Sequence, residues 1–334
     1  MTAGRSSWRN LVLFVGVECL LLLIALELAV RLTGLDTRLL KPLLYYQGWD
    51  QEVYRVSDDV VLHYELKPGA SAFFPPARKV TINSLGFRGR ERSWKKPKGV
   101  FRIVCLGGSN TYGASVSDGE TYPARLEAAL NRLSRGRFEV WNAGACARVL
   151  SQDVQVARQI VAHAEPDLLV FQVSNCGRRP FLIDAPFQRY FDQDPTLYAE
   201  NLKYLPGSGP AQASLMRHWR FYRALVLGAN QLLDSPRRKP CTEKDNRFNL
   251  EAVARFYEEF GGRVPMVLLI NPRGSVDSSL AFLGIGAIRL GRKLAKKHPH
   301  DYDMIHPPPY VYRWYADVIL AELDARGLLP KGKG

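Results

Sequence analysis

The sequence predicts a three-layer α/β/α domain with a mostly parallel sheet, preceded by a transmembrane helix, in a chain of 334 residues. From about residue 100, apolar runs of strand length alternate with helical patterns, as in parallel sheets covered by helices. Several of these runs end in glycine or small polar residues. In a right-handed parallel arrangement those ends meet at one edge of the sheet.

The composition fits a globular protein with a full core, since 46% of the residues are hydrophobic and 23% are charged. The net charge of +14 comes from scattered basic residues, without zinc-finger, RRM or helix-turn-helix spacing. We therefore expect no nucleic-acid partner. Attraction to anionic lipid headgroups or acidic glycans explains the charge equally well.

A run of about 20 mostly apolar residues near the N-terminus is long enough to cross a bilayer. Glu18 and Glu27 oppose insertion, at about 2.5–3.5 kcal/mol for a charge at the helix centre, but the many large apolar side chains outweigh them. Glu27 can pair with Arg31 one turn later. No small-residue cleavage site follows, so we assign residues 1–10 to a tail and 11–32 to an uncleaved anchor.

Residues 33–98 hold few regular patterns and many turn formers, which indicates a membrane-proximal linker with short edge strands such as Lys79–Asn83. The segment Asn83–Arg90, NSLGFRGR, is dense in glycine and arginine. It could contact a substrate, but a structural turn capping the sheet is the favoured interpretation. The domain itself is predicted at residues 99–330, with an insertion or lid at 177–245.

The first strand of the domain, Phe101–Leu106, runs into Gly107 and Gly108 and presents Ser109. Glycines at a strand end permit a sharp turn and a close approach by another group. A serine at that point lies where open α/β sheets bind ligands. On this stretch alone, an ordinary turn with a solvated serine is the better interpretation.

Alternating elements follow in order. A helix is predicted at 123–133, with Thr121 near its cap and Pro123 in its first turn. The further predicted strands are 138–141, 168–173 and 265–270, and the further helices are 151–164, 212–232 and 250–260. The last helix has an apolar stripe at helical spacing that packs it onto the sheet, formed by Val311, Trp314, Tyr315, Val318 and Ile319.

The C-terminal part supplies an acid and a base in the sequence Asp303-Met304-Ile305-His306. Two residues three apart can face the same way on one helical turn or tight loop. The Asp303 carboxylate can then hold the His306 imidazole in one tautomer while its other nitrogen points at a nucleophile. The prolines that follow stiffen the exit from His306.

Four short blocks, in this order and at these strand ends, resemble those of the SGNH (GDSL-like) hydrolase superfamily. The blocks are GGSNTYG around Ser109, NAG ending at Gly144, VSN ending at Asn175, and DMIH containing Asp303 and His306. The resemblance spans roughly residues 80–325. Together with the anchor and NSLGFRG, it looks like a bacterial membrane-anchored branch. The chain departs from the family at Gly108, where aspartate is usual, and around the third block, where Val173-Ser174-Asn175-Cys176 stands in place of Gly-x-Asn-Asp.

This resemblance implies a flavodoxin-like sheet and specific roles for the residues in the blocks. Ser109 would attack an ester carbonyl, with His306 as general base and Asp303 orienting it. The oxyanion hole would be formed by the backbone N–H groups of Ser109 and Gly144 and the side-chain amide of Asn175.

The expected function is a membrane-anchored serine esterase that removes acyl groups, in the first instance acetyl groups, from an envelope glycan or lipid. An O-acyltransferase on the same site and a non-catalytic envelope scaffold are the alternatives. The family places the anchor in the cytoplasmic membrane and the domain outside it, because flanking charges give no clear orientation.

No cofactor or metal is predicted. The cluster of histidines and aspartates at residues 298–306 could be read as a metal site, but such surface groups near a turn are usually solvated. Cys105 lies inside the first strand, where a plain buried thiol is expected.

Overall fold

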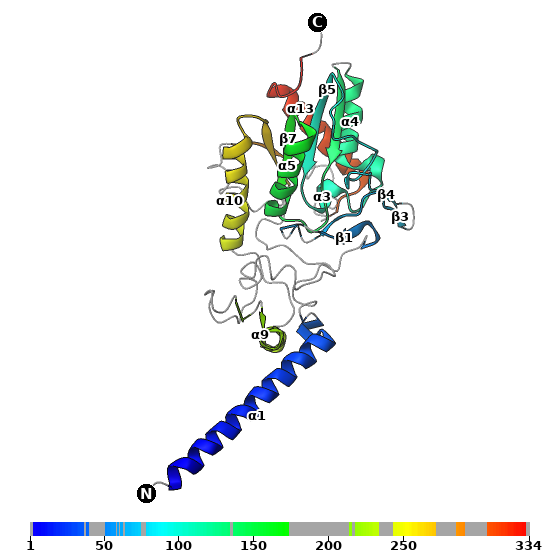
Figure 1. Ribbon diagram of the computed structural model, residues 1–334. Coiled ribbons are helices and arrows are strands. Elements are labelled where there is room, and N and C mark those ends of the chain that lie inside the picture. Colours follow the sequence, from blue (N-terminus) through cyan, green and yellow to red (C-terminus); the bar gives the residue numbers. More distant parts are fainter. Residues whose placement is uncertain are drawn as a thin grey trace. The chain divides into compact units, whose positions relative to one another are not determined.

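The computed structural model describes residues 3–36, 38–39, 51–57, 59, 61–62, 64–74, 78–133, 136–173, 214–215, 218–233, 243–271, 285–290 and 306–331 (Figure 1). The chain divides into two compact units. One comprises Met1–Tyr45 with Asp184–Lys239, and the other comprises Tyr46–Ile183 with Pro240–Gly334.

The second unit is built on a five-stranded sheet in which every neighbouring pair of strands is parallel. Its strands are β5 (Val100–Leu106), β6 (Arg137–Asn142), β7 (Leu168–Val173), β8 (Met266–Ile270) and β9 (Gly286–Arg289). Their order, β6-β5-β7-β8-β9, is the 2-1-3-4-5 order of the flavodoxin-like fold. The predicted sheet is confirmed. The sequence had given no signal for β9, a strand of four residues.

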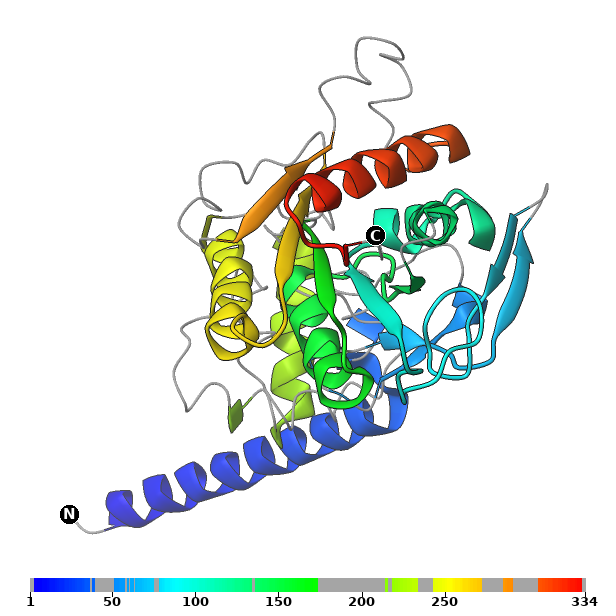
Figure 2. The same cartoon turned by 90° about the horizontal axis from the view of Figure 1, so that it is seen from above.

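Among the described residues, two helices cover each face of this sheet, which gives the predicted three layers (Figure 2). One face carries α4 (Tyr122–Arg132) and α13 (Pro309–Ala325), and the other carries α5 (Leu150–Ala164) and α10 (Glu243–Phe260). The predicted cap is present, since the Thr121 hydroxyl accepts the Ala124 N–H at 3.4 Å.

The alternation of side chains along β5 links the two cores. Ile103 and Cys105 are buried among the residues of α4 and α13, whereas Val104 and Leu106 are buried among those of α5 and α10. Successive side chains of a strand point to opposite faces, so a strand buried on both faces reads as one apolar run. This is why the sequence showed β5 so clearly.

Residues before β5 form two antiparallel hairpins outside the main sheet. They pair β1 (Tyr54–Val56) with β2 (Tyr64–Leu66) and β3 (Ser71–Phe74) with β4 (Arg78–Thr81), and a short 3-10 turn, η1 (Gln51–Val53), precedes β1. A second 3-10 turn, η2 (Asp118–Glu120), follows β5 and precedes α4. The strand predicted at Lys79–Asn83 is therefore β4, which ends at Thr81. It ends there because Asn83 starts a turn, in which its side-chain oxygen accepts the N–H groups of Leu85 and Phe87 at 3.0 and 2.9 Å.

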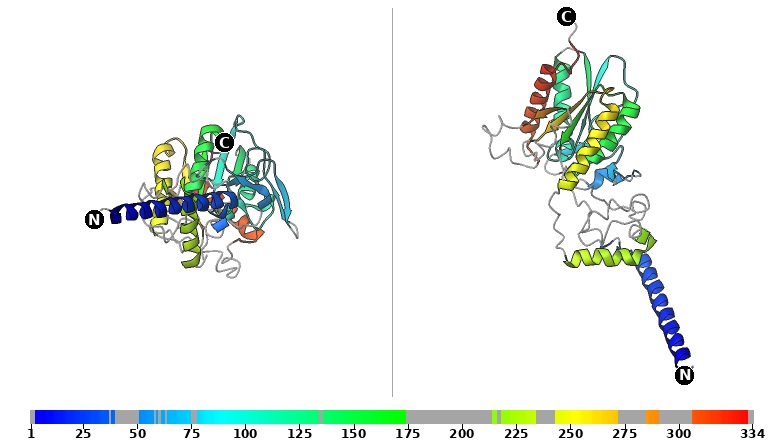
Figure 3. Two further views of the ribbon diagram at one scale, coloured as in Figure 1. Left: turned by 60° about the horizontal axis from the view of Figure 1, so that its bottom comes forward. Right: turned by 90° about the vertical axis from the view of Figure 1, so that its left-hand side faces the viewer.

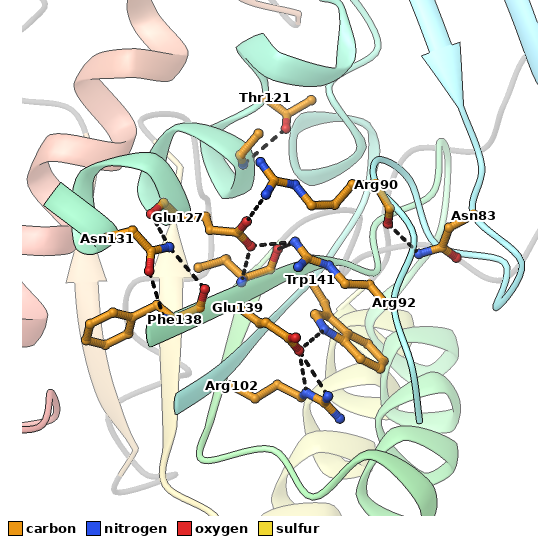
Figure 4. Close-up of polar contacts among 12 residues, drawn as sticks. Asn83, Arg90, Arg92, Arg102, Thr121, Glu127, Asn131, Phe138, Glu139 and Trp141 are labelled. Atoms are coloured by element: carbon orange, nitrogen blue, oxygen red, sulfur yellow. Dashed lines mark hydrogen bonds and ion pairs between the residues drawn. The ribbon is translucent and has the colours of Figure 1, made fainter. Parts of the chain in front are cut away.

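A buried arginine near the start of β5 connects the sheet to its surroundings (Figure 4). The Arg102 side chain is fully buried and donates to the Glu139 carboxylate at 3.0 Å and to the carbonyls of Ser93, Trp94 and Ala164 at 2.6–3.1 Å. Its guanidinium also lies 4.4 Å from the centre of the Trp141 ring. A buried charge with this many partners is satisfied in the folded state.

The first unit contains α1 (Ala3–Thr33) and α9 (Arg220–Leu233). By length and composition, Trp8–Thr33 could cross a membrane, since its most apolar 18-residue window has a mean hydropathy of 2.6 and no buried residue. The expected pair of Glu27 and Arg31 is present, with Nε 2.6 Å from Oε1.

Candidate active site

Ser109 is the first residue of α3 (Ser109–Tyr112), a single helical turn that follows the carboxyl end of β5. The Tyr112 N–H donates to the Gly108 carbonyl at 3.0 Å, and the Gly113 N–H donates to the Ser109 carbonyl at 2.8 Å. The Ser109 side chain is partly exposed. Since the chain leaves β5 and its neighbour β7 toward opposite halves of the sheet, Ser109 stands at the switch point where such sheets bind ligands.

Gly107 allows the turn before Ser109 to pack directly on β7. Its φ of +154° is one that side chains rarely adopt, and an added Cβ would lie 2.5 Å from the Thr111 hydroxyl and 2.7 Å from Cβ of Gln172. Only glycine permits this approach.

Gln172 holds the Ser109 turn against the sheet, a role that the sequence interpretation missed. Its side-chain oxygen accepts the Thr111 N–H at 2.9 Å and the Thr111 hydroxyl at 2.6 Å, and its amide donates to Asn271, just past β8, at 2.8 Å. Gln172 is fully buried. One signal was available, because glutamine is the single polar residue in the otherwise apolar strand LLVFQV.

Gly144, the second predicted oxyanion donor, lies against the same turn. A Cβ at Gly144 would stand 2.4 Å from the Tyr112 nitrogen, so the loop after β6 approaches α3 as closely as backbone permits. The neighbouring Ala145 N–H donates to the Gly107 carbonyl at 3.0 Å. The Gly144 N–H itself donates to the Asn142 side-chain oxygen at 3.1 Å. The structure thus places Gly144 against the helical turn that begins at Ser109.

Arg88 holds the far end of the Ser109 turn. Its guanidinium donates to the carbonyls of Tyr112, Gly113 and Val116 at 2.6–2.7 Å and to the Asp118 carboxylate at 3.0 Å. With 4% of its surface exposed, Arg88 is buried. The segment NSLGFRGR therefore includes a structural arginine, in agreement with its favoured interpretation.

The segment that carries His306 is fixed beside the loop after α3. The Ser115 hydroxyl donates to the Pro307 carbonyl at 2.6 Å, across 192 positions of sequence. In the apolar stripe of α13, Val311, Tyr315 and Ile319 are at most 4% exposed, and the two other predicted residues, Trp314 and Val318, are partly buried against the same core. His306 is half-buried. Asp303 and Asn175 lie outside the described residues, as do residues 298–305 and most of the predicted insertion.

Asp153 of α5 is a buried carboxyl group beneath the site. Burial raises its pKa from 3.8 to about 7, opposed by the Arg148 guanidinium 3.8 Å away and by the backbone N–H of Gly107. Arg148 also donates to the Ala143 carbonyl at 2.7 Å, next to Gly144. The Asp153 carboxyl group is fully enclosed, beside an arginine that holds the backbone of the site.

Replacing Asp153 by asparagine should change how stability depends on pH. A folded-state pKa above the unfolded value gives stability that is complete below pH 3.8 and is lost as the pH rises to about 7. Asparagine does not titrate, so the variant does not lose this stability. The unfolding free energy of Asp153→Asn minus that of wild type should therefore increase by up to about 4 kcal/mol between pH 4 and pH 7.5. Urea unfolding of the full chain in detergent measures it. A difference that stays constant with pH would contradict it.

Cys105, which lies near the switch point, does not act as a second nucleophile. Cys105 is fully buried in β5, as expected, and burial raises the pKa of its thiol to about 12. Because the thiolate is the reactive form, this cysteine is inert at neutral pH.

No protein-family model and no curated protein matches this chain. Among solved structures, a member of the lipolytic protein G-D-S-L family from Veillonella parvula is similar at 11% identity, with 66% of this chain and 97% of that one covered and a TM-score of 0.37. The psychrotrophic esterase EstA from Pseudoalteromonas sp. is similar at 11% identity, with 67% and 97% covered and a TM-score of 0.40. The lipase/acylhydrolase from Enterococcus faecalis is similar at 16% identity, with 70% and 100% covered and a TM-score of 0.41.

Proposed function

We propose that this chain is a serine esterase with Ser109 as nucleophile and His306 as general base. The observation that carries the proposal is the hydrogen bond from Ser115 to Pro307, which ties the neighbour of His306 to the loop six residues after Ser109. The position of Ser109 at the switch point of a 2-1-3-4-5 sheet supports it further.

The chemistry would follow from the position of each group. His306 would take the proton from the Ser109 hydroxyl as the oxygen attacks the ester carbonyl, and Asp303 would orient the imidazole. The oxyanion would be stabilised by the N–H groups of Ser109 and Gly144 and by the Asn175 amide. For this, the Gly144 N–H would turn from the Asn142 oxygen toward the substrate. His306 would give the Ser109 proton to the leaving alcohol as the ester C–O bond breaks. It would then take a proton from the water that attacks the acyl carbon, so that the acyl group leaves as an acid and Ser109 regains its proton.

We place the enzyme on the membrane that residues 11–32 would span, with the catalytic unit on the outer side of the cytoplasmic membrane. The substrate proposed is an acyl ester, in the first instance an acetyl ester, on an envelope glycan or lipid. The net charge of +14 on the chain would attract a glycan or lipid that carries negative charge.

Labelling with a fluorophosphonate probe tests the proposal. This probe reacts with activated serines, so the full chain in detergent should be labelled, and peptide mapping should place the adduct on Ser109. Ser84→Ala, which alters an exposed serine bound to Glu91, should be labelled like wild type, whereas Ser109→Ala should not. If folded wild type takes up no probe, the esterase proposal is wrong and a non-catalytic envelope scaffold is the remaining interpretation.

Product analysis separates hydrolysis from transfer on the same site. With an acetyl-ester donor alone, an esterase releases acetate, whereas an O-acyltransferase forms an acylated glycan when a glycan acceptor is added. We expect acetate release that does not depend on acceptor.

A further inference from the structure

We propose that α9 is an interfacial helix that lies in the headgroup region of the lipid bilayer, with its exposed apolar stripe toward the acyl chains. The stripe consists of Phe221, Leu225 and Leu232. The inference rests on the proposed role of α1 as a membrane anchor.

The start of α9 is fixed to the last turns of α1. The Glu27 carboxylate accepts the N–H groups of Arg220 and Phe221 at 3.2 and 2.7 Å, and the Arg31 guanidinium donates to the His218 carbonyl at 3.1 Å. The first N–H groups of a helix have no partner within it, so a carboxylate is stabilising there. These contacts hold the first turn of α9 at the level of Glu27.

Glu27 lies near the end of the stretch of α1 that could cross a bilayer. The stretch Trp8–Thr33 has 26 residues, so at about 1.5 Å per residue it is roughly 39 Å long, against about 30 Å for the hydrocarbon core of a bilayer. Glu27 lies six residues, or roughly 9 Å, before its end (33 − 27). A helix held at this level lies near the boundary between the hydrocarbon core and the headgroups.

Two of the three residues of the apolar stripe of α9 are exposed, and Phe221 is partly exposed. At about 100° per residue, Phe221, Leu225 and Leu232 fall within one narrow sector of the helix. Leu225 is 55% exposed and Leu232 is 88% exposed. Figure 3 shows α9 lying crosswise to α1 at the C-terminal end of α1.

The opposite side of α9 is fixed to the chain beyond α1. Arg223 lies about 200° from Leu225 on the helix. Its guanidinium pairs with Asp36 at 3.1 Å, and both side chains are 1% exposed. Asp36 follows the end of α1 at Thr33, so it lies away from the membrane-crossing stretch. The stripe opposite Arg223 therefore faces the bilayer.

Electrostatics favours lipid over a protein as the occupant of this face. Arg31, which is half-exposed, and Arg220 lie beside the first turn of α9, where anionic headgroups would attract them. Basic residues that are attracted to anionic lipids are typical of interfacial helices, and Arg31 and Arg220 supply them here.

Site-specific photo-crosslinking to lipid tests the proposal. The full chain carries p-benzoylphenylalanine at position 225 or 232 and is reconstituted in nanodiscs of phosphatidylethanolamine and phosphatidylglycerol. Position 20, which is 58% exposed on α1, is the lipid-facing control, and position 133, which is 40% exposed in the second unit, is the solvent-facing control. Mass spectrometry identifies the adducts.

We expect lipid adducts at positions 225 and 232 at a yield within about threefold of position 20, and none at position 133. Lipid adducts at position 20 without any at 225 and 232 would overturn the interfacial helix and leave the anchor intact. Adducts at 225 and 232 to protein alone would assign the stripe to a second copy or another partner. No lipid adduct at position 20 would overturn the anchor, and the interfacial helix with it.

Discussion

Ser109→Ala is expected to lower kcat/KM for a simple ester such as p-nitrophenyl acetate by on the order of 10⁴-fold or more. The Ser109 oxygen would form the bond to the acyl carbon, and alanine offers no replacement atom. Any residual rate would come from water acting at the oxyanion donors. Steady-state kinetics of the full chain in detergent measures the loss.

Two controls separate this result from a loss of folding. Ser109 is partly exposed, so its replacement should change the unfolding free energy by less than about 1 kcal/mol. Ser84→Ala should retain the wild-type rate because the Ser84 hydroxyl is exposed and donates to Glu91 at the surface. A Ser109→Ala variant that hydrolyses the ester at the wild-type rate would refute the proposed nucleophile.

Arg102→Met is expected to lower the unfolding free energy by about 3–5 kcal/mol. Methionine fills part of the space but makes none of the hydrogen bonds that Arg102 donates to Glu139 and to three carbonyls. The Glu139 carboxylate then stays buried with the Trp141 indole N–H, 3.2 Å away. Urea unfolding followed by tryptophan fluorescence measures the loss.

The matched control is Arg158→Met, an arginine paired with Glu259 at the surface. The side chains of that pair are 36% and 48% exposed, so solvent screens the interaction and its loss should cost about 1 kcal/mol or less. Adding Glu139→Gln to Arg102→Met should recover part of the stability, because it removes the unpaired charge. Equal costs for Arg102→Met and Arg158→Met would show that the buried contacts add no net stability.

Much of the main sheet was predictable because its signals are local. The strand at residues 101–106 and the strand at 168–173 are continuous apolar runs bounded by turn residues, and both are buried on two faces. The start of α4 was marked by a threonine cap and a proline. Strand β9 was not predicted because its four residues, GAIR, are too few to show the periodic hydrophobic pattern of a strand.

The sequence by itself determined the apolar helix at the N-terminus, the strands and helices of the α/β unit, and the serine at a glycine turn. Each of these depends on residues close together in the chain. The tertiary structure alone decided that Gly144 packs on Tyr112, that Gln172 holds the serine turn, and that Glu27 caps a helix 193 residues away. These contacts join residues far apart in sequence, and close packing and the need to satisfy buried polar groups select them only once the chain has folded.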